Sequence, residues 1–139
     1  MEIIANALQT VAANQNVYFT DTITGGSMSI SHRSNSGLVN LFGNTNQCRA
    51  RFKVTFGANI AIPEGETVGP VSLAIAIDGE AVQSTTMIVT PTAVDTFFNV
   101  FSAIFIDVPR GNVETVSVKN IGTNPVDVEN ANLIVERVA

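Results

Sequence analysis

The segment from Gln47 to Ala58, with the sequence QCRARFKVTFGA, decides the fold class because its side chains alternate in character. One set is apolar: Cys48, Ala50, Phe52, Val54 and Phe56. The other set is polar or charged: Gln47, Arg49, Arg51, Lys53 and Thr55. Successive side chains of a strand point to opposite faces of a sheet. The pattern therefore predicts a long β-strand whose apolar set, Cys48 included, faces a hydrophobic core.

The rest of the chain follows the same pattern. Short runs rich in Val, Ile, Phe and Thr are bounded by Gly, Pro and Asn, which is typical of strands and turns. The other predicted strands span residues 7–13, 15–20, 28–32, 37–42, 71–77, 81–89, 94–108, 113–120 and 126–138. Asp78-Gly79 predicts a two-residue hairpin. About ten strands at this spacing predict one all-β domain over residues 1–139, a sandwich or a barrel.

The composition predicts association between subunits. Charged residues make up only 14% of the 139 residues and hydrophobic residues 45%, whereas soluble domains average about 25% charged residues. Burial between subunits would protect such a surface; a monomer coated in Asn, Thr and Ser is the alternative. The net charge of −5 argues against direct nucleic-acid binding, which needs a basic face.

Several features bear on location. Cys48 is the single cysteine, so no intramolecular disulfide forms. The N-terminus lacks the basic and apolar regions of a signal peptide, and no apolar run is long enough to span a membrane. We expect synthesis in the cytoplasm, with no membrane insertion. An exterior location would be reached by assembly or by lysis.

Two predicted strands are apolar on both faces. In the strand 94–108, one face carries Phe98, Val100, Ile104 and Ile106, and the other carries Phe97, Phe101, Ala103 and Phe105. Asn132–Val135 near the C-terminus is similar. A strand of this kind needs a cover on its outer face. A second subunit is the favoured cover, and a loop of the same chain is the alternative.

Arg49, Arg51 and Lys53 share one face of their strand, where like charges repel unless they are partnered. The candidate partners are Glu129, Glu136, Asp95 and Asp107. Three interpretations stay open: an ionic layer between subunits, a dock for an acidic surface, and a solvated sheet face. The candidate subunit interface consists of Arg49, Arg51, Lys53, Phe97, Phe101, Phe105, Ile134 and Glu136.

Few residues could support catalysis. His32 is the only histidine and lies in a polar stretch, and no Gly-x-Ser-x-Gly motif is present to supply a nucleophile. Cys48 in a core would be inert. Glu64, Glu66 and Asp107 could bind calcium, but solvated acids are the favoured interpretation. We expect no catalytic residue, no cofactor and no metal site.

Several stretches resemble one jelly-roll family: ALQTVAANQNVYF (7–19), ISHRSNSGLVNL (30–41), CRARFKVTFGANI (48–60), VSLAIAIDGEAV (71–82), AIFIDVPRGNVETVSVKN (103–120) and VENANLIVERV (128–138). Their order resembles the globular heads of complement C1q and tumour necrosis factor (TNF), and especially bacterial and bacteriophage members. These include the C-terminal domains of collagen-like spore-surface proteins. The chain lacks a collagen-like stalk and is poor in aromatic residues, with Tyr18 as its single tyrosine and no tryptophan.

The resemblance implies a two-sheet jelly-roll sandwich that forms a homotrimer. Stand-alone chains of this style resemble bacteriophage head decorations or head-fibre knobs. The resemblance thus implies a non-enzymatic protein on the virion surface, bound to the major capsid protein or another virion component. Two alternatives are a module that binds a cell-surface glycan or a protein through loops 25–36, 63–69 and 90–95, and a spore-coat or exosporium surface component.

Overall fold

The computed structural model describes residues 1–139 as twelve β-strands and one turn of 3-10 helix, η1 (Gln83–Thr85). Sheet A contains, in order, β10 (Phe98–Pro109), β6 (Arg49–Ala61), β12 (Val126–Arg137), β1 (Glu2–Ala5) and β3 (Asp21–Thr24), with β2 (Gln9–Val11) paired to β12. Sheet B contains, in order, β4 (Ile30–His32), β5 (Val39–Phe42), β11 (Val113–Asn120), β7 (Val71–Ile77) and β8 (Glu80–Ala81), with β9 (Met87–Val89) paired to β7.

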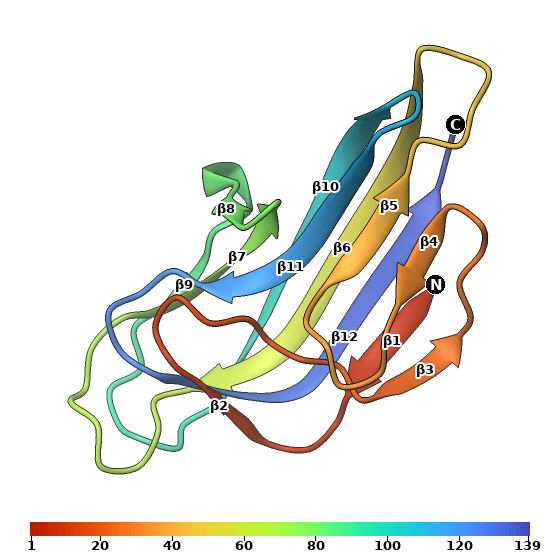
Figure 1. Ribbon diagram of the computed structural model, residues 1–139. Helices are drawn as coiled ribbons and strands as arrows, with labels where there is room; N and C mark the ends of the chain where they lie inside the picture. The colour runs from red at the N-terminus through yellow and green to blue at the C-terminus, as the bar shows by residue number, and fades with distance from the viewer.

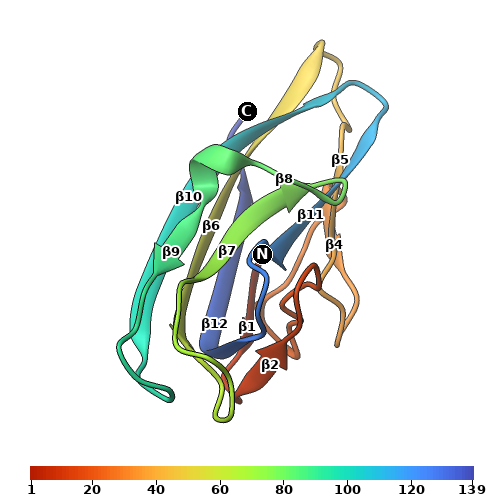
Figure 2. The same ribbon diagram turned by 90° about the vertical axis from the view of Figure 1, so that its left-hand side faces the viewer.

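The chain crosses between the two sheets several times. β5 belongs to sheet B, β6 to sheet A and β7 to sheet B again, and β1 pairs antiparallel with the last strand, β12. Figure 1 shows β6, β12 and β1 side by side, and Figure 2 shows β9 beside β10 along one flank. This arrangement confirms the predicted all-β sandwich of two sheets. No helix in it is long and apolar enough to cross a membrane.

The core lies between the sheets and contains the alternating set of β6. Ala50, Phe52, Val54 and Phe56 are all fully buried, as the sequence predicts. Sheet B meets them with Val39, Leu41, Leu73, Ile75, Val116 and Val118. The rings of Phe19 and Phe56 pack edge to face, with centroids 6.4 Å apart, an arrangement that aromatic quadrupoles favour.

Two predicted strands, 71–77 and 113–120, have the bounds of β7 and β11. The hairpin after β7 is also confirmed. Asp78 and Gly79 have φ angles of 53° and 85°, and β7 pairs with β8 directly across them. Positive φ at both central residues is what a tight two-residue hairpin turn requires.

Other boundaries were wrong. Residues 15–20 form only isolated bridges at Asn16 and Phe19, and the short strands β1 and β3 were missed. The predicted strand 81–89 is interrupted by η1, where the Thr85 hydroxyl accepts a hydrogen bond from the backbone N–H of Ile75 at 2.9 Å. The buried Thr85 side chain thus takes the place of a backbone partner for Ile75 in a neighbouring strand. The periodicity of the sequence does not reveal such a substitution.

Asn120 is a fully buried polar residue that organises the turn between β11 and β12. Its amide nitrogen donates to the carbonyl of Val11 at 3.0 Å and to that of Asn124 at 2.9 Å. Its amide oxygen accepts from the backbone N–H of Gly122 at 2.9 Å. The side chain therefore ties β2 to the start of β12.

We predict that Asn120→Ala lowers the free energy of unfolding by about 2–4 kcal/mol, because it leaves buried backbone groups without partners. Urea denaturation at a fixed protein concentration measures the change. Asn112→Ala, in an exposed turn, is the matched control and should cost less than about 0.5 kcal/mol. Equal effects of the two variants would contradict this role of Asn120.

Candidate interaction surface

The face of sheet A that points away from the core, here called the outer face, carries the predicted interface residues in rows. Strand register places Phe105, Lys53 and Glu136 in one row across β10, β6 and β12. The next row holds Ala103, Thr55, Ile134 and Glu2. The third row holds Phe101, Gly57, Asn132 and Ile4. The structure therefore brings together residues from both ends of the chain.

The apolar side chains of the outer face are uncovered. The exposed fractions are 66% for Phe101, 62% for Phe105 and 38% for Ile134. The opposite side of β10 is buried at Val100, Ile106 and Val108. No loop of the same chain covers the two rings, so the covering-loop alternative is wrong. Phe97, another predicted interface residue, is 39% exposed and lies just before β10.

β10 is also the edge of sheet A, and it is an unusual edge. It pairs with β6 over twelve residues without a break in register, and it carries no charge from Phe98 to Ile106. The other edge strands have two to four residues. Proteins normally protect sheet edges with charges, prolines, bulges or short strands. Because most of β10 lacks such protection, this edge is the candidate contact surface.

Gly57 leaves space in the middle of the outer face. A Cβ atom added there would meet only the carbonyl oxygen of Val100, at 3.7 Å. Neither the backbone conformation nor the packing of this chain therefore requires a glycine. Gly57 therefore places no side chain between Phe101 and Asn132, its neighbours in the row.

A row of amides crosses the outer face beyond Phe101, and the sequence did not predict it. The Asn99 amide nitrogen donates to the side-chain oxygen of Asn59 at 3.1 Å. The Asn59 nitrogen donates in turn to the side-chain oxygen of Asn130 at 3.2 Å. Asn130 has a φ of 55° and lies in the register shift of β12. Only that irregularity brings its side chain into the row.

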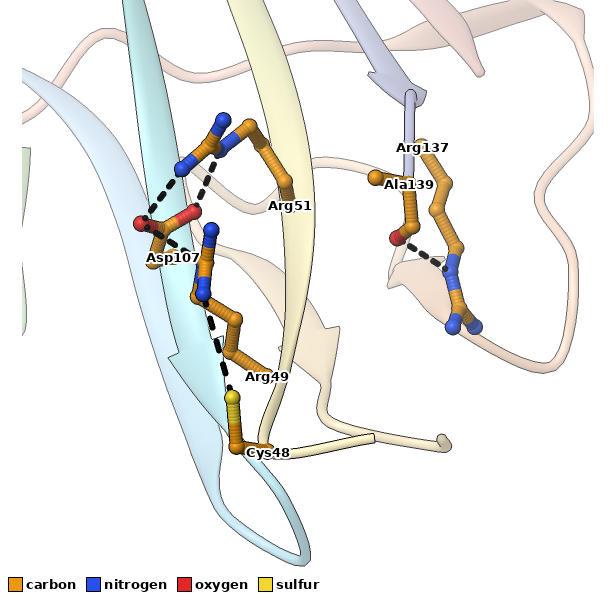
Figure 3. Close-up of polar contacts among 6 residues, drawn as sticks. All are labelled: Cys48, Arg49, Arg51, Asp107, Arg137 and Ala139. Atoms are coloured by element: carbon orange, nitrogen blue, oxygen red, sulfur yellow. Dashed lines mark hydrogen bonds and ion pairs between the residues drawn. The ribbon is translucent and has the colours of Figure 1, made fainter. Parts of the chain in front are cut away.

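The opposite end of the outer face is ionic (Figure 3). Arg51 holds Asp107 with two hydrogen bonds, from Nε to Oδ1 at 2.7 Å and from Nη2 to Oδ2 at 3.1 Å. The Nε of Arg49 lies 3.2 Å from Oδ2 of the same carboxylate. The hydrogen bond from Arg51 lowers the pKa of Asp107 below its ordinary value, and the charges of both arginines contribute. The same contact raises the pKa of Arg51.

Of the four predicted partners of this basic face, Asp107 alone forms ion pairs. Glu136 stands opposite Lys53 in register without an ion pair between them. Glu129 lies opposite Asn59, and Asp95 lies in the segment between β9 and β10. The sequence does not indicate which acidic residue lies beside which basic residue across the strands, because this depends on the strand register.

Cys48 was wrongly predicted to be buried. It is exposed and precedes β6, which begins at Arg49. The chain turns there because residues 43–48 pack against the β10–β11 turn, where Gly43 and Asn112 are joined by a backbone hydrogen bond of 2.8 Å. A side chain at Gly43 would collide with the carbonyl of Pro109. β6 therefore begins at Arg49, two residues later than the sequence indicates, and its buried set begins at Ala50.

His32 is half-buried, and its Nε2 lies 2.8 Å from the carbonyl oxygen of Ser36. Its ring meets the edge of Phe19, with centroids 6.3 Å apart. Its Nδ1 is buried without a hydrogen-bond partner, and no hydrogen bond or ion pair joins the ring to an acid or a nucleophile.

The calcium candidates lie apart. Glu64 and Glu66 follow the C-terminal end of β6, whereas Asp107 pairs with Arg51 at the other end. Ten residues of strand separate those ends by about 33 Å. No group of three His, Cys, Asp or Glu side chains is placed to hold a metal ion, and a single chain has no surface pocket.

The three loops predicted for recognition do not form one surface. Loops 63–69 and 90–95 adjoin, with the N–H of Asp95 bonded to the carbonyl of Ile62 at 2.9 Å. The start of loop 25–36 lies at the other end of sheet A, where Arg137 donates to the hydroxyl of Ser29 at 2.9 Å. That loop also contains strand β4.

No protein-family model and no curated protein matches the chain. Among solved structures, it is similar to the globular domain of zebrafish complement 1qA protein, with a TM-score of 0.63 and 11% identity over 96% of this chain and 93% of that chain. It is also similar to Eiger TNF from S. frugiperda, with a TM-score of 0.67 and 11% identity over 100% of this chain and 92% of that chain. The fold is thus a jelly roll of the C1q and TNF type.

We predict that Arg51→Met raises the pKa of Asp107 toward its ordinary value of 3.8. The wild-type carboxyl should titrate below that value. A lowered folded-state pKa stabilises the fold above the unfolded value, and this contribution is lost as the pH falls through the folded value. Carboxyl NMR titration of the two proteins measures the shift. An unchanged Asp107 titration in the variant would show that the ion pair does not form in solution.

Proposed function

We propose that the chain is a non-enzymatic structural module that assembles into a homotrimer through the outer face of sheet A. The observation that carries the proposal is the pair of exposed rings, Phe101 and Phe105, on a long edge strand. Burying a phenylalanine side chain contributes about 1.5–3 kcal/mol. Two rings in each contact therefore provide a substantial driving force before the entropic cost of association is subtracted.

The apolar residues of the outer face are arranged as a cyclic oligomer requires. Apolar side chains lie on both halves of the face, with Phe101 and Phe105 on β10 and with Ile134 and Ile4 on β12 and β1. When the β10 half of one copy meets the β12–β1 half of the next, the contact joins unlike surfaces and can close as a cycle. Three copies is the number expected from the likeness to C1q and TNF.

Lys53 and Glu136 support the same arrangement. They lie in the row of Phe105 and form no ion pair within the chain. A neighbouring copy could pair both of them at the edge of the apolar contact. Arg49 and Arg51 lie beyond this row, at the end of the face.

We predict that Phe101→Glu combined with Phe105→Glu converts the trimer to a monomer, because a buried contact would have to accept unpaired charges. The native mass of the untagged protein, measured by light scattering, should fall from three chains to one. Wild-type mass should stay at three chains when a chelator is added.

Val68→Glu is the control, since Val68 is 49% exposed and lies in a loop at the end of β6. It should leave the mass at three chains. Circular dichroism should show that all variants keep the strand content of the wild type. A wild-type monomer, or a double variant that stays trimeric, would refute the proposed contact.

We further propose that the trimer decorates a bacteriophage head or forms the knob of a head fibre, bound to the major capsid protein or another virion component. Its support is the resemblance described above and the low content of charged residues, 14%. The test is mass spectrometry of virions purified on a density gradient. The chain should copurify with the particles and detach as a trimer.

Two other outcomes would replace the virion assignment. Absence from virions with presence on purified spores would indicate a spore-surface component. Specific retention on a glycan array, lost on substitution within loops 63–69 and 90–95, would indicate a recognition module at that end of the molecule.

A further inference from the structure

The backbones of three arginines lie close together at one corner of the molecule, where β10 ends beside the start of β6. Arg49 stands opposite Pro109 in register, and the N–H of Arg110 donates to the carbonyl of Cys48 at 3.0 Å. Backbone hydrogen bonds to Gly43 hold the turn that carries Arg110. This set, Arg49, Arg51 and Arg110, is here called the arginine corner. Figure 1 shows its turn at the same end as the C-terminus.

The arginine corner has more donors than acceptors. Asp107 is the only acidic side chain within it and is shared by Arg49 and Arg51. The Nη1 of Arg49 reaches only the sulfur of Cys48, at 3.8 Å, and the guanidinium of Arg110 has no partner. The side chains of Arg49 and Arg51 are 49% and 41% exposed. Three guanidinium groups therefore share one acidic side chain, in a chain whose net charge is −5.

The other end of the sandwich has the opposite sign. Segments 61–70 and 90–97 carry Glu64, Glu66 and Asp95 and no basic residue, and Figure 2 shows both at the end remote from the arginine corner. The molecule is thus polarised along its strands. Such a charge separation orients a protein as it approaches a charged surface.

We infer that the arginine corner docks onto a carboxylate-bearing surface of a different protein. Asp107 already holds Arg51 through two bonds, so that planar group loses little freedom when the corner binds. The unpaired donors of Arg49 and Arg110 suit a carboxylate, which accepts two parallel N–H bonds from a guanidinium. The corner is complete within one chain, so the inference does not depend on the trimer.

An acidic protein surface fits this corner better than a nucleic acid. The negative charge of the rest of the chain would repel a long phosphate backbone, whereas a local cluster of Asp and Glu needs only the corner. In the proposed virion setting, the corner would be the end that faces the particle.

The test uses the full chain and an immobilised peptide of consecutive glutamates as the probe. Arg49→Gln combined with Arg110→Gln should weaken binding about tenfold or more at low salt, since a hydrogen bond to a charged group contributes more than a neutral one. Arg33→Gln combined with Lys119→Gln removes the same charge elsewhere and should change binding less than about twofold, as surface charges contribute little. Binding by the wild type should weaken as salt is added.

Four results would overturn the inference. They are no binding by the wild type, equal weakening in the control, tighter binding to single-stranded DNA than to the peptide, and loss of native mass in the corner variant. The last result would make the corner an ionic layer between copies. A wild-type monomer that still binds the peptide would refute the trimer and leave the arginine corner standing.

Discussion

The pairing of β6 with β10 on one side and β12 on the other determines where the other parts of sheet A lie. β6 is thirteen residues long, and its alternation buries one face from Ala50 to Ile60. Because side chains alternate strictly along a strand, the burial of one set directs the other set outward. Arg51, Lys53 and Gly57 are therefore on the outer face; all three are in register with β10, and Lys53 and Gly57 also with β12.

The two edges of sheet A differ, and this difference is the basis of the proposed interaction surface. β3 is a short strand whose pairing with β1 shifts register. β10 is long and regular and is apolar toward solvent at Phe101 and Phe105. A single chain cannot hide these rings, because both sides of β10 would need a packed layer and the sandwich provides only one. The proposed association would cover these rings and would leave the ends of the strands free for other contacts.

The sequence correctly predicted which side chains of β10 and β12 point away from the core. Phe101, Phe105 and Ile134 were assigned from their parity in strands that are apolar on both faces, and the structure leaves all three exposed. Arg110 was missed because it lies in a turn and joins Arg49 only through the packing of that turn against Gly43. The amide row was missed because Asn130 enters it through a register shift. Neither feature leaves a periodic signal in the sequence.

The sequence by itself determined the fold class, the core parity of β6 and the bounds of β7 and β11, because alternation and turn chemistry are local properties. Tertiary structure decided which strands pair, that Cys48 is exposed, and that Asp107 is the acid shared by Arg49 and Arg51. These outcomes depend on contacts between residues far apart in the chain. Such contacts are set by the packing of whole sheets, and no local pattern encodes them.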